Sequence, residues 1–238
     1  MSALSVALAA VIGVLVGAAA RPMIFARSVP SPASSRSRCP HCEHGILDRP
    51  RPLPASGRCP RCAGPIGPTA ISTEVTMGAA FAAVAAGGAT GWFAAAQYWL
   101  AACGITLAMI DLAVQRLPDV LTVPACAGTL VLLTAATVAD EAGSLARAAA
   151  AAAIVTAIFL LLALVAGMGL GDVKLAPAIG ALLGWTSWKS VLWGTAAGFL
   201  LGLVGAVLLL ASGRGRRTQL AFGPFLVLGA LAVTVTAS

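Results

Sequence analysis

The sequence predicts an all-α polytopic integral membrane protein with about eight transmembrane helices and one small loop domain. Of the 238 residues, 59% are hydrophobic and only 10% are charged, and the mean hydropathy is +0.95. A soluble domain could not keep so apolar a chain in water. The charged residues separate long apolar runs, as expected of a chain that crosses a bilayer several times. The net charge of +7 therefore does not indicate nucleic-acid binding, because the basic residues lie in the predicted loops.

The first apolar run covers residues 3–20 and is followed by Arg21. No basic residue precedes this run, which favours a spanning helix over a cleaved signal peptide. The three alanines at 18–20 would suit a cleavage site, so a signal peptide is the alternative interpretation. We expect a first transmembrane helix over residues 1–20, with the N-terminus outside and Arg21 inside.

Residues 21–73 are the sizeable hydrophilic segment, and they hold eight of the thirteen arginines. Two Cys-x-x-Cys pairs separated by sixteen residues organise this segment, and their spacing is typical of a structural zinc site. The predicted ligands are Cys39, Cys42, Cys59 and Cys62. Two disulfides or unrelated thiols are the alternatives, but the arginines favour the cytoplasm, where thiols stay reduced. His41 and His44 could replace a cysteine, but we expect both to be exposed.

The next apolar stretch, residues 75–110, carries no formal charge and is interrupted by glycines at 87–91. It has room for two tightly connected helices. Glu74 directly precedes the first of them. The simplest interpretation of Glu74 is an acidic residue at a helix N-terminus, where the helix dipole favours negative charge.

Five further apolar runs cover residues 120–139, 148–166, 175–186, 190–211 and 220–237. The run at 175–186 is short enough to be re-entrant. If it crosses, thirteen of the fifteen basic residues fall on the cytoplasmic side, as the positive-inside rule requires. We therefore count eight helices and assign residues 74–238 to a seven-helix membrane core.

Two carboxylates fall at the same predicted membrane face, each at the end of an apolar run. Asp111 ends one run, and Asp172 closes the glycine-rich break at 167–174. An ionisable group at the edge of a bilayer is costly and is a functional candidate by default. Glycines adopt backbone angles that other residues avoid and let neighbouring backbone come close, so Gly169 and Gly171 could aim the Asp172 carboxylate inward. Two such carboxylates can share one proton and activate a water, which is aspartic-protease chemistry.

Two charged residues near this pair receive supporting roles. Asp119 lies eight residues after Asp111 and directly after Pro118, so we expect it to cap the following helix or to accept a hydrogen bond beside the pair. Lys174 either modulates Asp172 or anchors the helix at the cytoplasmic face.

Together these features resemble the bacterial prepilin peptidases, intramembrane aspartic peptidases of the GxGD type that process type IV prepilins and the pseudopilins of type II secretion. The resemblance rests on an N-terminal span, the two Cys-x-x-Cys pairs, Glu74, Met109-Ile110-Asp111, Leu117-Pro118-Asp119, the glycine motif ending in Asp172-Val173-Lys174, and Phe222-Gly223-Pro224-Phe225. It implies that Asp111 and Asp172 are the catalytic pair. It also implies prepilin or pseudopilin substrates and methylation of the new N-terminus from S-adenosylmethionine.

Two departures from the family pattern lie in the N-terminal part, to which the methyl transfer is usually tied. The family carries a Gly-Ser-Phe-Leu-Asn-like signature where this chain has Gly17-Ala-Ala-Ala-Arg21. An Asn-Ile-Pro between the cysteine pairs is also absent. The predicted location is the bacterial inner membrane, multi-pass, with the catalytic face in the cytoplasm.

Two other classes of function stay open at this point. Paired intramembrane carboxylates also mark the pathways of ion- or proton-coupled transporters, but no acidic residue falls at mid-depth of a predicted span. A non-catalytic assembly factor of a pilus or secretion system, docking a partner through the loop domain, would leave the paired aspartates without a purpose.

Overall fold

The computed structural model describes residues 2–30, 32–48, 53–211 and 221–236, and in this part of the chain the protein is nearly all helical. The helices are α1 (Ala3–Arg27), α2 (Ser72–Gly87), α3 (Gly91–Val114), α4 (Asp119–Val138), α5 (Leu145–Ala166), α6 (Leu170–Thr186), α7 (Trp188–Ala211) and α8 (Gly223–Thr236). The predicted fold class is confirmed. The arginines at 214, 216 and 217, which the positive-inside argument used, lie outside the described residues.

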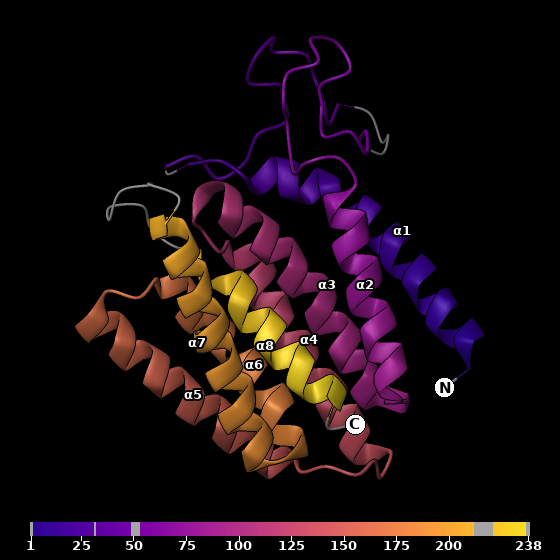
Figure 1. Ribbon diagram of the computed structural model, residues 1–238, viewed down its shortest axis with the longest axis vertical. Coiled ribbons are helices and arrows are strands. Elements are labelled where there is room, and N and C mark those ends of the chain that lie inside the picture. The colour runs from indigo at the N-terminus through magenta and orange to yellow at the C-terminus, as the bar shows by residue number, and fades with distance from the viewer. Residues whose placement is uncertain (1, 31, 49–52, 212–220, 237–238) are drawn as a thin grey trace.

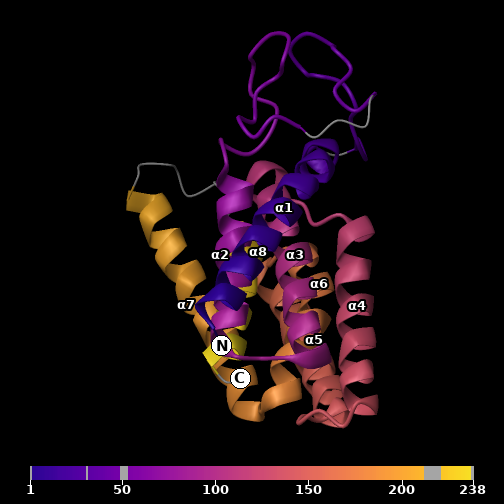
Figure 2. The same ribbon diagram turned by 90° about the vertical axis from the view of Figure 1, so that its right-hand side faces the viewer.

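Five of the described helices, α1, α3, α4, α5 and α7, are long and apolar enough to cross a membrane. The three shorter helices pack among them in one bundle (Figures 1 and 2). Between α1 and α2, the described residues 28–30, 32–48 and 53–71 form a loop region that projects from one end of the bundle, which we call the loop end. The protein is therefore a multi-pass membrane protein with one projecting loop domain.

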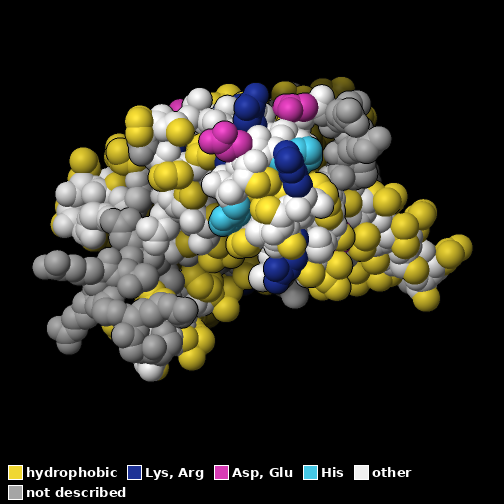
Figure 3. Space-filling model, turned by 90° about the horizontal axis from the view of Figure 1, so that it is seen from above, with side chains coloured by type: hydrophobic (Ala, Val, Ile, Leu, Met, Phe, Trp, Pro, Cys, Tyr) yellow, Lys and Arg dark blue, Asp and Glu magenta, His cyan; other side chains and the backbone are white. Residues whose placement is uncertain are grey.

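The surface of the bundle has the apolar character that a bilayer requires. Large hydrophobic side chains are exposed along the outer helices, among them Leu8, Leu15, Val131, Leu161, Leu203 and Leu208. Seen onto the loop end, charged and histidine side chains gather over the centre and hydrophobic side chains spread beside them (Figure 3). This distribution matches helices in lipid and a loop domain in water.

Helix α1 begins as predicted and continues to Arg27, seven residues past the predicted end of the first transmembrane helix at residue 20. The prediction ended the helix at Arg21 because of its charge. In the structure Arg21 is 2% exposed and its charge is paired with Glu74, so the helix does not have to end there. The last turn of α1 reaches into the loop domain, where Phe25 packs with Ile66 and two of the cysteines.

The glycine interruption at 87–91 forms the predicted tight connection between α2 and α3. Gly88 and Gly91 both adopt left-handed backbone angles that disfavour other residues. The Glu141 carboxylate then accepts hydrogen bonds from the N–H groups of Trp92 and Phe93, at 2.6 and 2.9 Å. Glu141 therefore caps the N-terminus of α3 from the α4–α5 connection, at the end opposite the loop domain.

The short run at 175–186 belongs to α6, a continuous helix of 17 residues that starts at the loop end. Its far end is capped by Arg147, whose side chain donates to the carbonyl oxygens of Gly184, Trp185 and Thr186 at 2.5–2.8 Å. Gly180 lets α6 lie directly on α5, because a Cβ there would be 2.8 Å from the Ala151 carbonyl oxygen.

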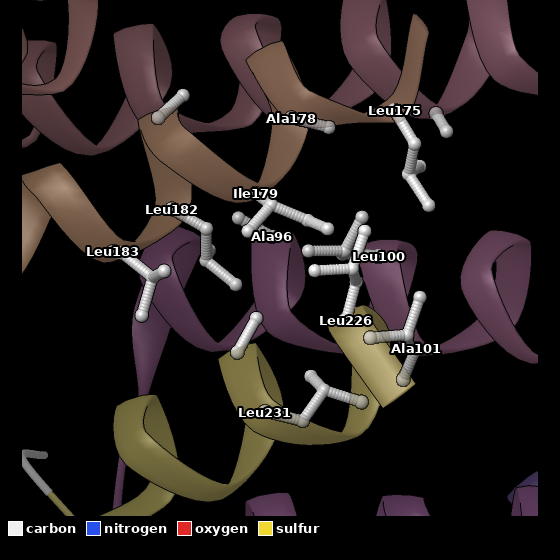
Figure 4. Packing of buried hydrophobic residues seen from close by; sticks show 14 of the residues in the cluster. Ala96, Leu100, Ala101, Leu175, Ala178, Ile179, Leu182, Leu183, Leu226 and Leu231 are labelled. Carbon is white, nitrogen blue, oxygen red and sulfur yellow. The ribbon is translucent and has the colours of Figure 1, made fainter. Parts of the chain in front are cut away.

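The centre of the bundle is formed by α3, α6 and α8 (Figure 4). The side chains that fill it are Leu100, Ala101, Ile179, Leu182, Leu226 and Leu231. Each of these residues is at most 7% exposed. This core holds the loop-end termini of three helices close together, and the candidate site lies at these termini.

Candidate active site

Three carboxylates lie at the loop end, each on a helix terminus. Asp111 is in the last turn of α3, Asp119 begins α4, and Asp172 is in the first turn of α6. All three line one cavity of about 730 Å³. Asp111 and Asp172 are 6% and 5% exposed, so both carboxylates are buried although they border a cavity. The structure brings together the two residues that the sequence analysis paired.

The Asp111 carboxylate faces the start of α8. The Gly223 N–H donates to Asp111 Oδ2 at 3.3 Å, and a Cβ on Gly223 would lie 3.2 Å from the same oxygen. The positive end of a helix dipole favours a negative charge at this position. Sequence reasoning used the Phe-Gly-Pro motif only as a family feature and missed its contact with Asp111. Pro224, at a typical N-terminal helix position, was the available signal that a helix begins here.

Of the two roles expected of Gly169 and Gly171, the structure has close approach at Gly171 and special backbone angles at neither. The left-handed backbone angle is at Gly167, which ends α5, whereas Gly169 has φ −61° and caps α6, its carbonyl oxygen accepting the Asp172 N–H at 3.1 Å. Gly171 is needed for close packing, because a Cβ there would lie 2.8 Å from Leu117 Cδ1 and 2.9 Å from Leu117 Cβ. The glycines thus set the approach of α6 and do not all bend the backbone.

The Leu117 side chain packs against two glycines, Gly171 and Gly223. Its Cδ1 would be 2.8 Å from a Cβ on Gly171 and 3.7 Å from one on Gly223. It is 9% exposed and lies in the short connection between α3 and α4. Leu117 therefore packs between the glycine that precedes Asp172 and the glycine that contacts Asp111, and it sets the spacing of the two carboxylate-bearing helices.

Replacing Gly171 with Ala is expected to lower both stability and activity. Overpacking against Leu117 costs about 1–3 kcal/mol, and displacing a catalytic group by about 1 Å can cost on the order of 10²-fold in rate. The double change Gly171→Ala with Leu117→Ala should recover much of both, because it removes the side chain that the new methyl group meets. Thermal unfolding in detergent and the rate of the prepilin cleavage that the sequence resemblance implies are the measurements. A double variant no better than Gly171→Ala alone would contradict this packing role.

Asp119 and Lys174 form an ion pair at the rim of the cavity. Lys174 Nζ donates to Asp119 Oδ1 at 2.5 Å. The Lys174 side chain is 49% exposed and the Asp119 side chain 66% exposed. The predicted capping role of Asp119 is wrong. Pro118 occupies the N-cap position of α4, and no side chain accepts a capping hydrogen bond from the backbone N–H groups there. The alternative, an acceptor beside the pair, agrees with the geometry.

Glu74 lies away from this cavity and does more than start a helix. Its carboxylate accepts two hydrogen bonds from the Arg21 guanidinium, at 2.5 and 2.7 Å, and both side chains are buried. Arg21 also donates to the carbonyl oxygen of Thr69 at 3.4 Å. Gly17 lets α1 and α2 meet here, because a Cβ would lie 2.7 Å from the Thr73 carbonyl oxygen. The pair joins α1, α2 and the base of the loop domain.

The four predicted metal ligands come together in the loop domain. Their sulfur atoms all lie within 4.8 Å of one another, and all four are free thiols. The two knuckles are built alike: isolated β-bridges join Arg38 to Gly45 and Arg58 to Pro65. Such a set of four sulfurs can hold one metal ion that prefers thiolate ligands. Disulfide pairing, the alternative from the sequence, is not present among these cysteines.

Backbone donors in the knuckles favour thiolates. The His41 N–H points at Cys39 Sγ and the Arg61 N–H at Cys59 Sγ, each at 3.5 Å. The N–H groups of Cys62 and Arg61 lower the pKa of the Cys59 thiol to about 6. The His44 N–H acts in the same way on Cys42, but burial and the neighbouring sulfurs outweigh it and raise the pKa of the Cys42 thiol to about 12, so Cys59 is the cysteine that most favours the thiolate form. Since a metal-bound cysteine is deprotonated, this environment suits a ligand.

The two histidines take no part in the cluster. His41 Nε2 lies 3.2 Å from the Pro65 carbonyl oxygen and its side chain is exposed, as predicted. His44 is half-buried, which the prediction missed. Its carbonyl oxygen accepts the Cys39 N–H in the first knuckle, so the tight turn keeps the residue partly covered. The four sulfurs therefore remain the candidate ligand set.

The loop domain also contacts the rim of the cavity. Arg116, which lines the cavity, donates to the carbonyl oxygens of Val29 and Ala33 at 3.2 and 3.0 Å. Arg36 in turn stacks on Phe25, with its guanidinium carbon 4.6 Å from the ring centre. Sequence reasoning counted Arg116 only as a basic loop residue and missed this link across more than eighty positions.

The fold and the site define a multi-pass membrane protein with two buried carboxylates beside one cavity and a separate four-cysteine cluster. Comparison with known proteins shows which family of membrane proteins this chain resembles. A model of the type IV leader peptidase family matches residues 98–211, a range that contains Asp111, Asp119 and Asp172. Comparison with solved structures finds no match.

The relatives are prepilin leader peptidase/N-methyltransferases. That of Burkholderia pseudomallei is 36% identical over 215 residues, covering 83% of this chain and 66% of the relative. That of Aeromonas hydrophila is 33% identical over 205 residues, covering 81% and 69%. The chain therefore belongs to the type IV leader peptidase family, and the resemblance noted from the sequence is confirmed. It spans about two thirds of the length of these relatives.

Proposed function

We propose that this protein is an intramembrane aspartic endopeptidase that removes the short leader of type IV prepilins or pseudopilins at the cytoplasmic face of the bacterial inner membrane. The observation that carries the proposal is the pair of buried carboxylates, Asp111 and Asp172, that line one cavity from two different helices. The names of the relatives support the substrate class. A transporter is less well supported, because the acidic residues of the described helices all lie in a first or last turn and none lies at mid-depth.

The proposed mechanism is general acid/base hydrolysis. An ionised carboxylate takes a proton from a water, whose oxygen forms a bond to the scissile carbonyl carbon, while the protonated partner donates to the carbonyl oxygen. The carbon–nitrogen bond then breaks and the amine leaves with a proton. The pair titrates as a unit. The Gly223 N–H supports Asp111 as the base, because a hydrogen bond to a carboxylate favours its ionised form.

We further propose that the same chain methylates the new N-terminus with S-adenosylmethionine as the methyl donor, as the names of the relatives suggest. One experiment tests both activities. A prepilin from the same genome is co-expressed with this protein, and the product is analysed for size and for the mass of its N-terminal peptide. A shorter product whose N-terminus carries one added methyl group is the expected result. A product of unchanged size would contradict the peptidase, and a cut but unmethylated product would contradict the methyl transfer alone.

For the supporting residues, we propose that Gly169 and Gly171 position the start of α6 and with it Asp172. Lys174 and Asp119 form the ionic rim of the cavity. Glu74 acts through structure, by pairing with Arg21.

We propose that the cysteine cluster holds zinc. Purified protein should carry about one zinc per chain, and Cys39→Ser should lose most of it, because three ligands leave the coordination shell open. Cys103→Ser, which changes a cysteine of α3 outside the cluster, is the matched control and should keep the metal. Metal analysis after purification is the measurement. Disulfides among the four cysteines in protein taken from intact cells would contradict the zinc site.

We propose a division into a first transmembrane helix (1–20), a loop domain (21–73) and a seven-helix core (74–238). The packing of Phe25 with Ile66 supports placing the last turns of α1 with the loop domain.

The proposed topology has the N-terminus outside and the loop end in the cytoplasm. A membrane-impermeant thiol reagent should label Asp140→Cys from outside, and Arg214→Cys only after permeabilisation. The positive-inside rule supports this orientation, because it places thirteen of the fifteen basic residues in the cytoplasm. Labelling of both positions in intact cells would contradict this orientation.

A further inference from the structure

The ion pair at the cavity rim is exposed and easily exchanged. Lys174 Nζ and Asp119 Oδ1 are 2.5 Å apart, but about half or more of each side chain is open to solvent. Such exposed pairs typically contribute no more than about 1 kcal/mol. Both residues line the same cavity as Asp111 and Asp172. A cation that enters this cavity can therefore replace Lys174 on Asp119 at little cost.

The cavity has two chemically different flanks. Asp119 and Lys174 form one of them, which we call the ionic rim. The other, which we call the apolar wall, is formed by Leu162 of α5, Phe199 of α7 and Phe222, and the two phenylalanine rings lie 5.2 Å apart. A peptide that runs through this cavity from α4 toward α7 has one end on each flank.

The flanks fix the direction of that peptide. The apolar wall is built by α5 and α7, whose outer faces carry exposed leucines suited to lipid. The part of the substrate that stays in the membrane matches this wall, because apolar surface is favoured there. The part that is cut off then lies along the ionic rim, at the water-exposed edge of the cavity.

We propose that Asp119 is a specificity-determining residue that binds a positively charged side chain of the leader, which it accepts in exchange for Lys174. The inference rests on the proposed peptidase function and assigns one subsite within it. Arg116, another cation at the cavity, does not take this place, since its guanidinium donates to the carbonyl oxygens of Val29 and Ala33. Lys174 is thus an internal competitor that occupies the subsite when no leader is bound.

Competition gives the two members of the pair opposite effects. Loss of Asp119 removes the subsite and weakens binding of a basic leader. Loss of the Lys174 charge removes the competitor and strengthens binding of a basic leader. If the pair only stabilised the fold, both changes would act in the same direction on every substrate.

The test compares two synthetic prepilin peptides that differ by Lys→Gln in the leader, cut by the full-length protein in detergent or lipid. Wild type should favour the lysine peptide by about fivefold in kcat/KM, the equivalent of about 1 kcal/mol. Asp119→Asn should lose this preference mainly through a higher KM for the lysine peptide. Lys174→Met should increase the preference. Asp140→Asn, at the opposite end of the bundle, is the matched control and should keep the wild-type ratio.

An unchanged ratio in Asp119→Asn, or a smaller ratio in Lys174→Met, would overturn the proposal. So would an equal loss of kcat on both peptides in Asp119→Asn, because that is the result of a purely structural role. Wild type that cuts neither peptide would contradict the peptidase function itself, and this result is distinct from cleavage without a charge preference.

Discussion

Asp111→Asn and Asp172→Asn are each expected to abolish prepilin cleavage, with a loss of at least about 10³-fold in rate. An amide is nearly isosteric with a carboxyl group but neither accepts the proton of the water nor supplies one. Both side chains are buried at the same cavity, and the third carboxylate that lines it, Asp119, is exposed and paired with Lys174, so no neighbouring carboxylate replaces either one. The measurement is the initial rate of leader removal in membranes that hold equal amounts of inserted protein.

The two losses should also be strongly non-additive. A pair that works as a unit is disabled by either change, so the double variant should be no slower than the singles. Asp119→Asn should be much milder on the chemical step, because its carboxylate lies on the exposed rim and pairs with Lys174. Full activity in Asp111→Asn together with complete loss in Asp119→Asn would move the first catalytic carboxylate eight residues along the chain.

Glu74→Gln is expected to have the largest effect on stability, with a cost of about 3–5 kcal/mol. The change leaves the Arg21 guanidinium charged, buried and without its carboxylate, and an uncompensated buried charge is strongly unfavourable. The ion pair also joins α1 to α2 at the base of the loop domain, so its loss should separate these helices. Thermal unfolding of the purified protein in detergent gives the measurement.

Two controls make this prediction specific. Replacing both partners with apolar residues, Arg21→Met with Glu74→Leu, should recover much of the stability, because no buried charge remains. Asp119→Asn, which breaks the exposed pair, should cost less than about 1 kcal/mol. If Glu74→Gln lowers the free energy of unfolding by no more than Asp119→Asn does, the result would contradict a stabilising role of the buried Arg21–Glu74 pair.

The sequence predicted the helices and the carboxylate pair because both depend on contrast within the chain. Long apolar runs identify the helices, and Asp111 and Asp172 stand out as charges at the ends of such runs. The cysteine cluster could also be predicted from the sequence, because the spacing of two Cys-x-x-Cys pairs by itself indicates which four cysteines come together. These features need no knowledge of how the helices face one another.

The contacts between helices could not be predicted in the same way. The helices are apolar on all sides, so periodicity does not reveal which face meets a neighbour. The Gly223 bond to Asp111 joins residues 112 positions apart, and the Lys174 pair with Asp119 joins residues 55 apart. The extension of α1 past Arg21 was missed for the same reason, because only the partner Glu74 makes a buried arginine acceptable.

The most direct test of the central claim uses purified protein reconstituted in lipid with a single prepilin and no other protein. Wild type should remove the leader at one bond, and Asp172→Asn, reconstituted at equal amount and with an unchanged unfolding temperature, should leave the prepilin intact. Cleavage by Asp172→Asn at a rate near that of wild type would contradict the assignment of Asp111 and Asp172 as the acid/base pair.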